Sequence, residues 1–303
     1  MSKIDILMAT YNGSAYIISQ IRSLQCQTFT DWTLLVHDDG STDNTLDLVR
    51  QLATADQRIR IIDDGVRFHD CALNFMHLLS CSDAPFCIFC DQDDIWLENK
   101  LQVMFDAIAS KDNTRPQAVY SNSFVYNPDL PDISGEASLC KPSQLKDVLF
   151  MNAGIQGCAL MFNAALRDIC RKVPSVVAMH DHVLTLGAVA FGTLTYVDRR
   201  LMLYRRHSST VTGPTAKRLS DRIAPFFDST KSVLEAKHYR AIRSFTECYA
   251  DLITPDKKRI FDDFFRFERQ SRLVRAIHVF TKDYRLYGSR TILAFKMIVR
   301  KLV

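Results

Sequence analysis

Nine residues, Phe86 to Asp94, constrain the fold of this 303-residue chain more than any other segment. They read Phe-Cys-Ile-Phe-Cys-Asp-Gln-Asp-Asp, so five apolar residues run directly into a group of three carboxylates. A short, bulky apolar run predicts a strand that is buried on both faces of a sheet. Open α/β sheets bind their ligands at the carboxyl ends of such strands. The segment therefore predicts an α/β fold with a ligand site where this strand ends.

The three carboxylates indicate what kind of ligand that site holds. Neighbouring carboxylates repel one another unless a cation or hydrogen-bond donors offset their charge. Mg²⁺ and Mn²⁺ prefer oxygen ligands, and Mg²⁺ commonly joins one or two carboxylates to substrate phosphates. We therefore interpret Asp91 and Asp93 as part of a metal–diphosphate site. We assign Asp94 a different role, as the N-cap of a helix expected to begin at Ile95.

Two earlier predicted strands, residues 4–9 and 33–37, also end in polar turns. An ionised carboxylate only accepts hydrogen bonds, so Asp39 suits the hydroxyls of a ribose or an N–H of a base. A capped turn with no ligand explains the same residues. Because the strand that begins at Phe86 also ends in acidic residues, we favour the ligand-binding role for Asp39. The two turns are Thr10-Tyr11-Asn12-Gly13 and Asp38-Asp39-Gly40-Ser41.

Composition excludes several classes of protein. Hydrophobic residues make up 47% of the chain, which excludes general disorder. The nine cysteines are odd in number and have no zinc-ligand spacing, so we expect reduced thiols in a cytoplasmic protein. The N-terminus lacks the apolar region of a signal peptide. No nucleic-acid motif accompanies the basic residues, so nucleic acid is not an expected partner.

Charge is divided unevenly along the chain. Residues 216–303 carry a net charge of +10, whereas residues 1–215 carry −6. The composition changes near Gly213-Pro214, which predicts a catalytic domain over residues 1–213 and a basic helical extension over residues 214–303. Within the extension we expect helices over residues 217–251, 255–268, 271–280 and 284–302.

The last of these helices is predicted to be amphipathic and basic. Two interpretations of it remain open. A basic amphipathic helix can lie in the interface of an anionic membrane, or it can pack its apolar face on the protein and leave a solvated basic edge. The apolar face is formed by Ile292, Phe295, Val299 and Leu302.

Four motifs, taken together and in order, resemble the family 2 glycosyltransferases. The resemblance covers roughly residues 1–210 and implies the GT-A fold, a Rossmann-like mixed α/β sheet flanked by helices. The form Asp-Gln-Asp-Asp-Ile-Trp is similar to a rhamnosyltransferase-like branch that builds bacterial surface polysaccharides. The motifs are Thr10-Tyr11-Asn12-Gly13, Gln27-Thr28-Phe29, Asp38-Asp39-Gly40-Ser41-Thr42-Asp43-Asn44-Thr45 and Asp91-Gln92-Asp93-Asp94-Ile95-Trp96.

The resemblance implies roles for the residues that match the family motifs. Asp91 would lie near the ribose of a nucleotide-sugar donor, and Asp93 would bind a Mn²⁺ or Mg²⁺ ion. The other residues expected to bind the donor are Thr10, Tyr11, Asn12, Asp39, Arg67 and Arg205.

Two further positions carry roles in the resemblance. Asp181 matches a catalytic carboxylate that precedes a helix, and a carboxylate can remove the proton of an acceptor hydroxyl as general base. A simple N-cap explains the same residue, and the role of the neighbouring His180 is open. His207 follows Tyr204-Arg205-Arg206 at a position where the family places a histidine on the metal or the diphosphate.

The expected reaction is inverting, metal-dependent transfer of a sugar to a glycan hydroxyl, with dTDP-rhamnose favoured as donor. UDP-glucose or UDP-galactose is the alternative donor. Alternatives of another class are a phosphatase using Asp38 or Asp39 as nucleophile, and a non-catalytic binding subunit. The resemblance also implies a lipid-linked acceptor for lipopolysaccharide O-antigen or capsule. The resemblance further implies that the protein is located in the cytoplasm, with peripheral attachment to the inner face of the cytoplasmic membrane as a second option.

Overall fold

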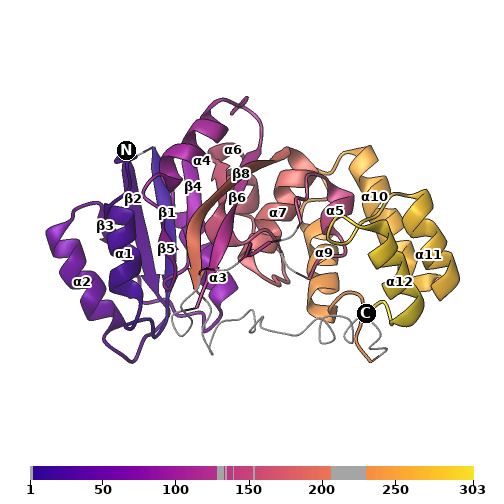
Figure 1. The fold of residues 1–303 in the computed structure, drawn as a ribbon, viewed down its shortest axis with the longest axis horizontal. Helices are drawn as coiled ribbons and strands as arrows, with labels where there is room; N and C mark the ends of the chain where they lie inside the picture. Colours follow the sequence, from indigo (N-terminus) through magenta and orange to yellow (C-terminus); the bar gives the residue numbers. More distant parts are fainter. Residues whose placement is uncertain (1–2, 128–132, 134, 139, 153, 206–229) are drawn as a thin grey trace.

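A computed structural model describes residues 3–127, 133, 135–138, 140–152, 154–205 and 230–303. The described chain forms one eight-stranded sheet with helices on both faces, and a group of C-terminal helices at one end of it (Figure 1). The strands lie in the order β3-β2-β1-β4-β7-β6-β8-β5. The pairings make β5 and β7 antiparallel to the other six strands. The predicted mixed α/β sheet is therefore confirmed.

The strands are β1 (Ile4–Thr10), β2 (Trp32–Asp38), β3 (Ile59–Ile61), β4 (Phe86–Cys90), β5 (Ile95–Trp96), β6 (Gln117–Tyr126), β7 (Leu160–Asn163) and β8 (Thr193–Arg205). The helices of the sheet region are α1 (Ile17–Gln25), α2 (Thr45–Ala55), α3 (Cys71–Cys81), α4 (Lys100–Ala109), α5 (Leu145–Val148), α6 (Ala164–Cys170) and α7 (His180–Phe191). The C-terminal helices are α9 (Ala236–Cys248), α10 (Pro255–Arg266), α11 (Arg272–Thr281) and α12 (Arg290–Val299).

Strand β4 lies in the middle of the sheet and is buried on both faces. Its alternate residues belong to two different apolar clusters: Ile88 packs with α1 and α4, whereas Phe89 packs with α3 and α7. This double burial explains the continuous apolar run in the sequence. Strand β1 pairs in parallel with both β2 and β4, so the carboxyl ends of these three strands meet at one edge of the sheet.

The segment after the acidic turn differs from the prediction. Ile95 and Trp96 form β5, an edge strand that pairs with Leu203 and Met202 of β8, and α4 begins only at Lys100. Asp94 is therefore not the N-cap of a helix. The prediction failed because the partner strand lies about a hundred residues further along the chain, where local patterns give no sign of it.

The C-terminal helices share an apolar core with the sheet region. The ring of Phe245 in α9 stacks on Phe191 at the end of α7, with centroids 5.6 Å apart. Phe264 in α10 contacts Phe150, with centroids 5.1 Å apart. Figure 1 shows α9 to α12 together beside α5 and α7. The boundary predicted at residues 213–214 lies outside the described residues.

Helix α12 is shorter than predicted and presents a different face to the protein. Its most buried residues are Leu293, Ala294 and Met297, whereas three of the four residues of the predicted apolar face are only partly buried. Leu302 is buried beyond the end of the helix. No helix in the described ranges combines the length and the apolar composition needed to span a bilayer.

The shared core predicts that α9 contributes to the stability of the whole fold. Phe245 is 1% exposed and contacts Phe191, Tyr249 and Phe261, so Phe245→Ala should lower the free energy of unfolding by about 3–5 kcal/mol. Phe280→Ala is the matched control, because Phe280 is 48% exposed and its loss should cost much less. Urea unfolding followed by circular dichroism measures both. Equal losses in the two variants would contradict a shared core.

Candidate active site

The turns after β1 and β2 are held together by the side chain of Asp38. Its Oδ1 accepts hydrogen bonds from the hydroxyls of Thr10 (2.9 Å) and Ser41 (2.6 Å), and its Oδ2 accepts from the backbone N–H groups of Gly40 and Ser41. Asn12 adds a second link, since its Oδ1 accepts from the backbone N–H of Thr42 at 2.8 Å. Thr10, Asn12 and Asp38 thus build the edge of the site.

A reciprocal pair of hydrogen bonds joins the turns after β1 and β4. The backbone N–H of Tyr11 donates to Gln92 Oε1 (3.1 Å), and Gln92 Nε2 donates to the carbonyl of Tyr11 (2.9 Å). Gly13 lies directly against this amide, and a Cβ at that position would clash with Gln92 Oε1. The side chain of Tyr11 remains 54% exposed and is available to a ligand.

Asp39 faces the loop that connects β3 to α3. Its two carboxylate oxygens accept hydrogen bonds from the backbone N–H groups of Phe68 (2.6 Å) and Asp70 (3.2 Å). Arg67 of the same loop lies over Gly40, where an added Cβ would meet the Arg67 side chain at 3.3 Å. The turn after β2, which carries Asp39, is therefore in contact with the loop that carries Arg67, so the two predicted donor-binding residues belong to neighbouring segments.

The acidic turn after β4 is anchored to the end of β8. Asp94 is fully buried, and its Oδ1 accepts a hydrogen bond from the backbone N–H of Arg205 at 3.1 Å. The guanidinium of Arg205 donates through Nε to the carbonyl of Asp93 at 2.7 Å. It also lies 4.9 Å from the ring of Tyr16 and 5.2 Å from that of Tyr126. Arg205 thus positions the turn that carries Asp93.

Burial disfavours ionisation of the carboxyl groups gathered at this strand end. Burial and the charge of Asp93 raise the pKa of Asp91 to about 6. Burial together with the charges of Asp91 and Asp93 raises the pKa of Asp94 well above its usual range. Lys100 is the buried cation nearby, and burial lowers its pKa to about 8. Its ammonium donates to the carbonyl of Cys158 at 2.7 Å.

Asp181 lies in the first turn of α7 and faces the same region. Burial and the charge of Asp91 raise its pKa to about 7, and the backbone N–H groups of His182 and Gly154 act in the opposite direction. Its Oδ1 has no hydrogen-bond partner among the described residues. Gly154 approaches so closely that an added Cβ would lie 2.5 Å from the Asp181 backbone.

The two histidines beside Asp181 belong to the core. His180 stacks on Phe75 with ring centroids 3.9 Å apart, and burial lowers its pKa to about 3. Burial and the neighbouring His238 lower the pKa of His182 to about 3 as well. Both rings are neutral at pH 7, so His180 does not replace the charge of an acidic residue.

Cys71, the first residue of α3, was not predicted to lie at the site. Cys71 is exposed at the surface. Desolvation and the charges of Asp91, Asp70, Asp181 and Asp39 nevertheless raise the pKa of its thiol to about 12. No sequence signal marks Cys71, since only the fold brings the start of α3 to this edge.

The described residues offer one cluster of possible metal ligands at this strand end, formed by Asp91, Asp94 and Cys158. Asp94 is fully buried and is already bonded to the backbone of Arg205, so it is a structural member of this cluster. Asp93 is partly exposed and lies outside the cluster. His207, the other predicted metal ligand, lies outside the described residues.

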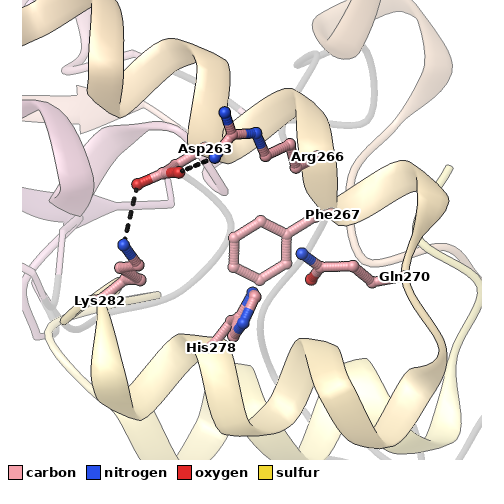
Figure 2. Close-up of a pocket in the computed structure, with 6 residues that line it drawn as sticks. All are labelled: Asp263, Arg266, Phe267, Gln270, His278 and Lys282. Carbon is pink, nitrogen blue, oxygen red and sulfur yellow. Dashed lines mark hydrogen bonds and ion pairs between the residues drawn. The ribbon is translucent and has the colours of Figure 1, made fainter.

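A separate pocket of about 190 Å³ lies among the C-terminal helices (Figure 2). Figure 2 shows Asp263 paired with both Arg266 and Lys282, at 3.1 and 3.5 Å. Its carboxylate is therefore neutralised by its own neighbours. Phe267, Gln270 and His278 complete the lining, and none of the predicted site residues that the structure describes takes part.

Comparison with known proteins identifies the family. Residues 5–170 match the model of "Glycosyl transferase family 2". The chain belongs to this family. The glycosyltransferase is 29% identical over 229 residues to "dTDP-rhamnosyl transferase RfbG" of Shigella flexneri, which covers 68% of this chain and 73% of the relative. It is 36% identical over 107 residues to the glucosyltransferase WfgD of Escherichia coli, covering 33% and 38% of the two chains.

Solved structures confirm the fold of this glycosyltransferase. S. aureus TarS in complex with UDP matches 93% of the chain with a TM-score of 0.59 and 15% identity, over 75% of the TarS chain. The mannosyltransferase PcManGT from Pyrobaculum calidifontis, solved with GDP-Man and Mn²⁺, matches 98% of the chain with a TM-score of 0.52 and 16% identity, over 86% of its own length. The predicted GT-A fold is therefore confirmed.

The raised pKa of Asp181 predicts a specific pH dependence of stability. Its folded pKa of about 7 lies above the ordinary value of 3.8, so ionisation of the buried carboxylate destabilises the fold as the pH rises between these values. Asp181→Asn removes this effect. The variant should therefore gain stability relative to the native chain between pH 5 and pH 8, by no more than about 3 kcal/mol, because about two pH units of this window lie between the two pKa values at 1.36 kcal/mol per unit. Urea unfolding of both proteins at pH 5 and pH 8 gives the difference in their free energies of unfolding. The same difference at the two pH values would contradict a buried carboxyl group that ionises in this range.

Proposed function

We propose that this enzyme is an inverting, metal-dependent glycosyltransferase that moves a sugar from a nucleoside-diphosphate donor to a glycan hydroxyl. The observation that supports this most is the meeting of Asp39 and Asp91 at one edge of the sheet, which follows from the parallel pairing of β1 with β2 and β4, with Asp181 near enough for the charge of Asp91 to raise its pKa. These acids come from the ends of two parallel strands and the start of one helix. They would bring Asp39 for the nucleotide base or ribose, Asp91 for the ribose and Asp181 as the general base into one site.

The donor half of the site uses the turns after β1, β2 and β4. The exposed ring of Tyr11 suits stacking on a nucleotide base, and the carboxylate of Asp39 suits an N–H of that base or a ribose hydroxyl. Asp91 would accept a hydrogen bond from the ribose. Arg67 and Arg205 would place positive charge near the donor phosphates. Thr10 and Asn12 hold the turn in shape through their bonds to the second turn.

The residues at the end of β4 fit a divalent cation. Asp91 and Asp93 lie two residues apart in the turn that follows β4, and oxygen ligands of this kind suit Mn²⁺ or Mg²⁺. Asp93 would be a ligand, with His207 as a second one. A bound ion would neutralise charge that develops on the leaving diphosphate.

Asp181 would act on the acceptor. A base is most effective when its pKa lies near the working pH, and Asp181 has a pKa of about 7. Its unpartnered Oδ1 would take the proton of the acceptor hydroxyl while that oxygen forms a bond to the anomeric carbon. The bond from the anomeric carbon to the diphosphate breaks on the opposite side, which inverts the configuration.

The donor we favour is dTDP-rhamnose, because the similarity to RfbG extends over 68% of the chain. UDP-glucose is the alternative donor, and it is supported by the similarity to WfgD, which covers only 33% of the chain. UDP-galactose is kept as a further alternative donor. A role in bacterial surface-polysaccharide assembly on a lipid-linked acceptor is supported by WfgD, whose name gives a diphosphoundecaprenol acceptor. A phosphatase is disfavoured, because Asp38 accepts four hydrogen bonds and is a poor nucleophile.

Asp93→Ala should abolish metal-dependent transfer and leave the fold intact. Removing one of several clustered carboxylates relieves repulsion in the protein without ligand, so the unfolding temperature should not fall. Release of nucleoside diphosphate with and without Mn²⁺ measures the activity. Glu98→Ala is the matched control, since Glu98 is an exposed acid in the same segment. Normal Mn²⁺-dependent turnover in Asp93→Ala would reject the metal assignment.

Asp181→Asn should still bind the donor nucleotide but lose transfer. Asparagine keeps the shape of the side chain and cannot accept the acceptor proton, so the saturated rate should fall about 10²–10⁴-fold. Calorimetry with the nucleoside diphosphate and steady-state kinetics measure the two effects separately. If affinity fell while the saturated rate held, Asp181 would be a binding residue.

We also propose that the C-terminal helices contact an anionic membrane, through α11. Leu273, Ile277 and Phe280 lie at helical spacing on one face of α11 and are 67%, 52% and 48% exposed. The net charge of +10 over residues 216–303 complements anionic lipid headgroups. Because α12 buries Leu293 and Met297, α11 is the better candidate for the contact.

The triple variant Leu273→Gln, Ile277→Gln, Phe280→Gln should therefore weaken co-sedimentation with anionic vesicles. It removes the exposed apolar face and keeps every basic residue, so residual binding should disappear at high salt. Leu252→Gln changes an equally exposed leucine outside α11 and serves as control. Equal sedimentation of the native chain and the triple variant would reject membrane contact through this face.

A further inference from the structure

Two histidines and an aspartate form a second polar cluster behind the donor turn. His37 lies near the end of β2, Asp64 in the loop after β3, and His77 in α3. The Nε2 atoms of His37 and His77 lie 3.3 and 2.7 Å from the two oxygens of Asp64. One possible ligand atom from each of the three residues lies within 4.8 Å of the others.

Asn74 determines which nitrogen of His37 carries the proton. Its Nδ2 donates to the backbone carbonyl of His37 at 3.3 Å, which orients the amide. Its Oδ1 then faces His37 Nδ1 at 2.6 Å and can only accept, so Nδ1 carries a hydrogen. In the neutral ring the lone pair of Nε2 therefore points at Asp64, which is also an acceptor. A cation between these two atoms, or a second proton on the ring, resolves this conflict.

The surroundings of the cluster are those of a metal site. His37 is fully buried, whereas the side chains of Asp64 and His77 are 35% and 21% exposed and leave a path from solvent. The ring of Phe68 lies 5.9 Å from that of His37 and 5.2 Å from that of His77. A buried ligand with a fixed tautomer, an apolar wall and an entry path are what a metal site requires.

We propose that His37 Nε2, the Asp64 carboxylate and His77 Nε2 bind a divalent transition-metal ion of the Zn²⁺ class. Imidazole suits Zn²⁺, whereas Mg²⁺ prefers oxygen ligands, so this site differs in chemistry from the acidic turn after β4. Ligand atoms about 2.0–2.1 Å from a tetrahedral ion lie about 3.3 Å apart, which matches the 3.3 Å between His37 Nε2 and Asp64 Oδ1. The 2.7 Å between His77 Nε2 and Asp64 Oδ2 is a direct hydrogen bond, which the ion would open and replace. Water would complete the coordination.

Such an ion would join β2 and α3 to the loop that carries Phe68 and Asp70. The backbone N–H groups of these two residues bind Asp39, so the ion would stiffen the loop around the proposed base-binding residue. The site touches no reacting atom and is a positioning site. It does not depend on the proposed glycosyl transfer, because metal binding alone tests it.

Titration of the purified full chain with Co²⁺, a spectroscopic substitute for Zn²⁺, tests the proposal. We expect one equivalent to give visible d–d absorption and to be displaced by Zn²⁺. His77→Gln and Asp64→Asn should each lower the Co²⁺ affinity by at least the roughly 10–100-fold that is typical of losing even an outer-shell partner. Using two variants keeps the test decisive if one of them fails to fold by circular dichroism.

Two controls separate this site from other ligands. His69→Asn changes an exposed histidine of the same loop that has a positive φ of 50°, a backbone conformation that asparagine tolerates, and should bind Co²⁺ normally. Asp93→Asn should keep the Co²⁺ spectrum of the histidine cluster, because it can remove only ion binding at the acidic turn. Absence of a Co²⁺ spectrum in the native chain, or an unchanged spectrum in both cluster variants, would overturn the proposal and leave an ion pair of His37 and Asp64.

Discussion

Negative charge gathered at one edge of the sheet is the constraint on which the site depends. Asp91, Asp94 and Asp181 are all buried enough to have raised pKa values, and Asp91 acts on both of the others. Folding tolerates this arrangement because Lys100 and the backbone of Arg205 offset part of the charge. The remainder is available to a cation or to the donor groups of a ligand. Parallel pairing of β1 with β2 and β4 brings the acidic turns together.

The residues of the family motifs divide into two groups. Asp38, Asn12 and Gln92 use their hydrogen bonds within the protein and hold the three turns in register. Tyr11 and Asp93 keep exposed surface toward the site. A motif residue is therefore not automatically a ligand-binding residue, since the side chains of Asp38, Asn12 and Gln92 hold the turns together.

The sequence predicted the sheet and the acidic strand ends because both depend on local patterns. A bulky apolar run such as Phe86–Cys90 is typical of a strand buried on both faces, and the turn chemistry that follows it is equally local. Asp94 was assigned wrongly because the pairing of β5 with β8 is not local. The apolar face of α12 was misplaced because tertiary packing determines which side of a short helix is buried. Cys71 and the cluster around His37 could not be predicted, since only the fold brings their neighbours together.

The central claim is that the acidic edge holds a nucleoside diphosphate together with a divalent cation. Isothermal titration calorimetry of the full chain with UDP, dTDP and GDP, each in Mn²⁺ and again in EDTA, tests it most directly. One of the nucleotides should bind at one equivalent in Mn²⁺ and lose at least about tenfold in affinity, equal to 1.4 kcal/mol, when the ion is removed. Equal affinities with and without the ion, or no binding of any of the three, would contradict the claim.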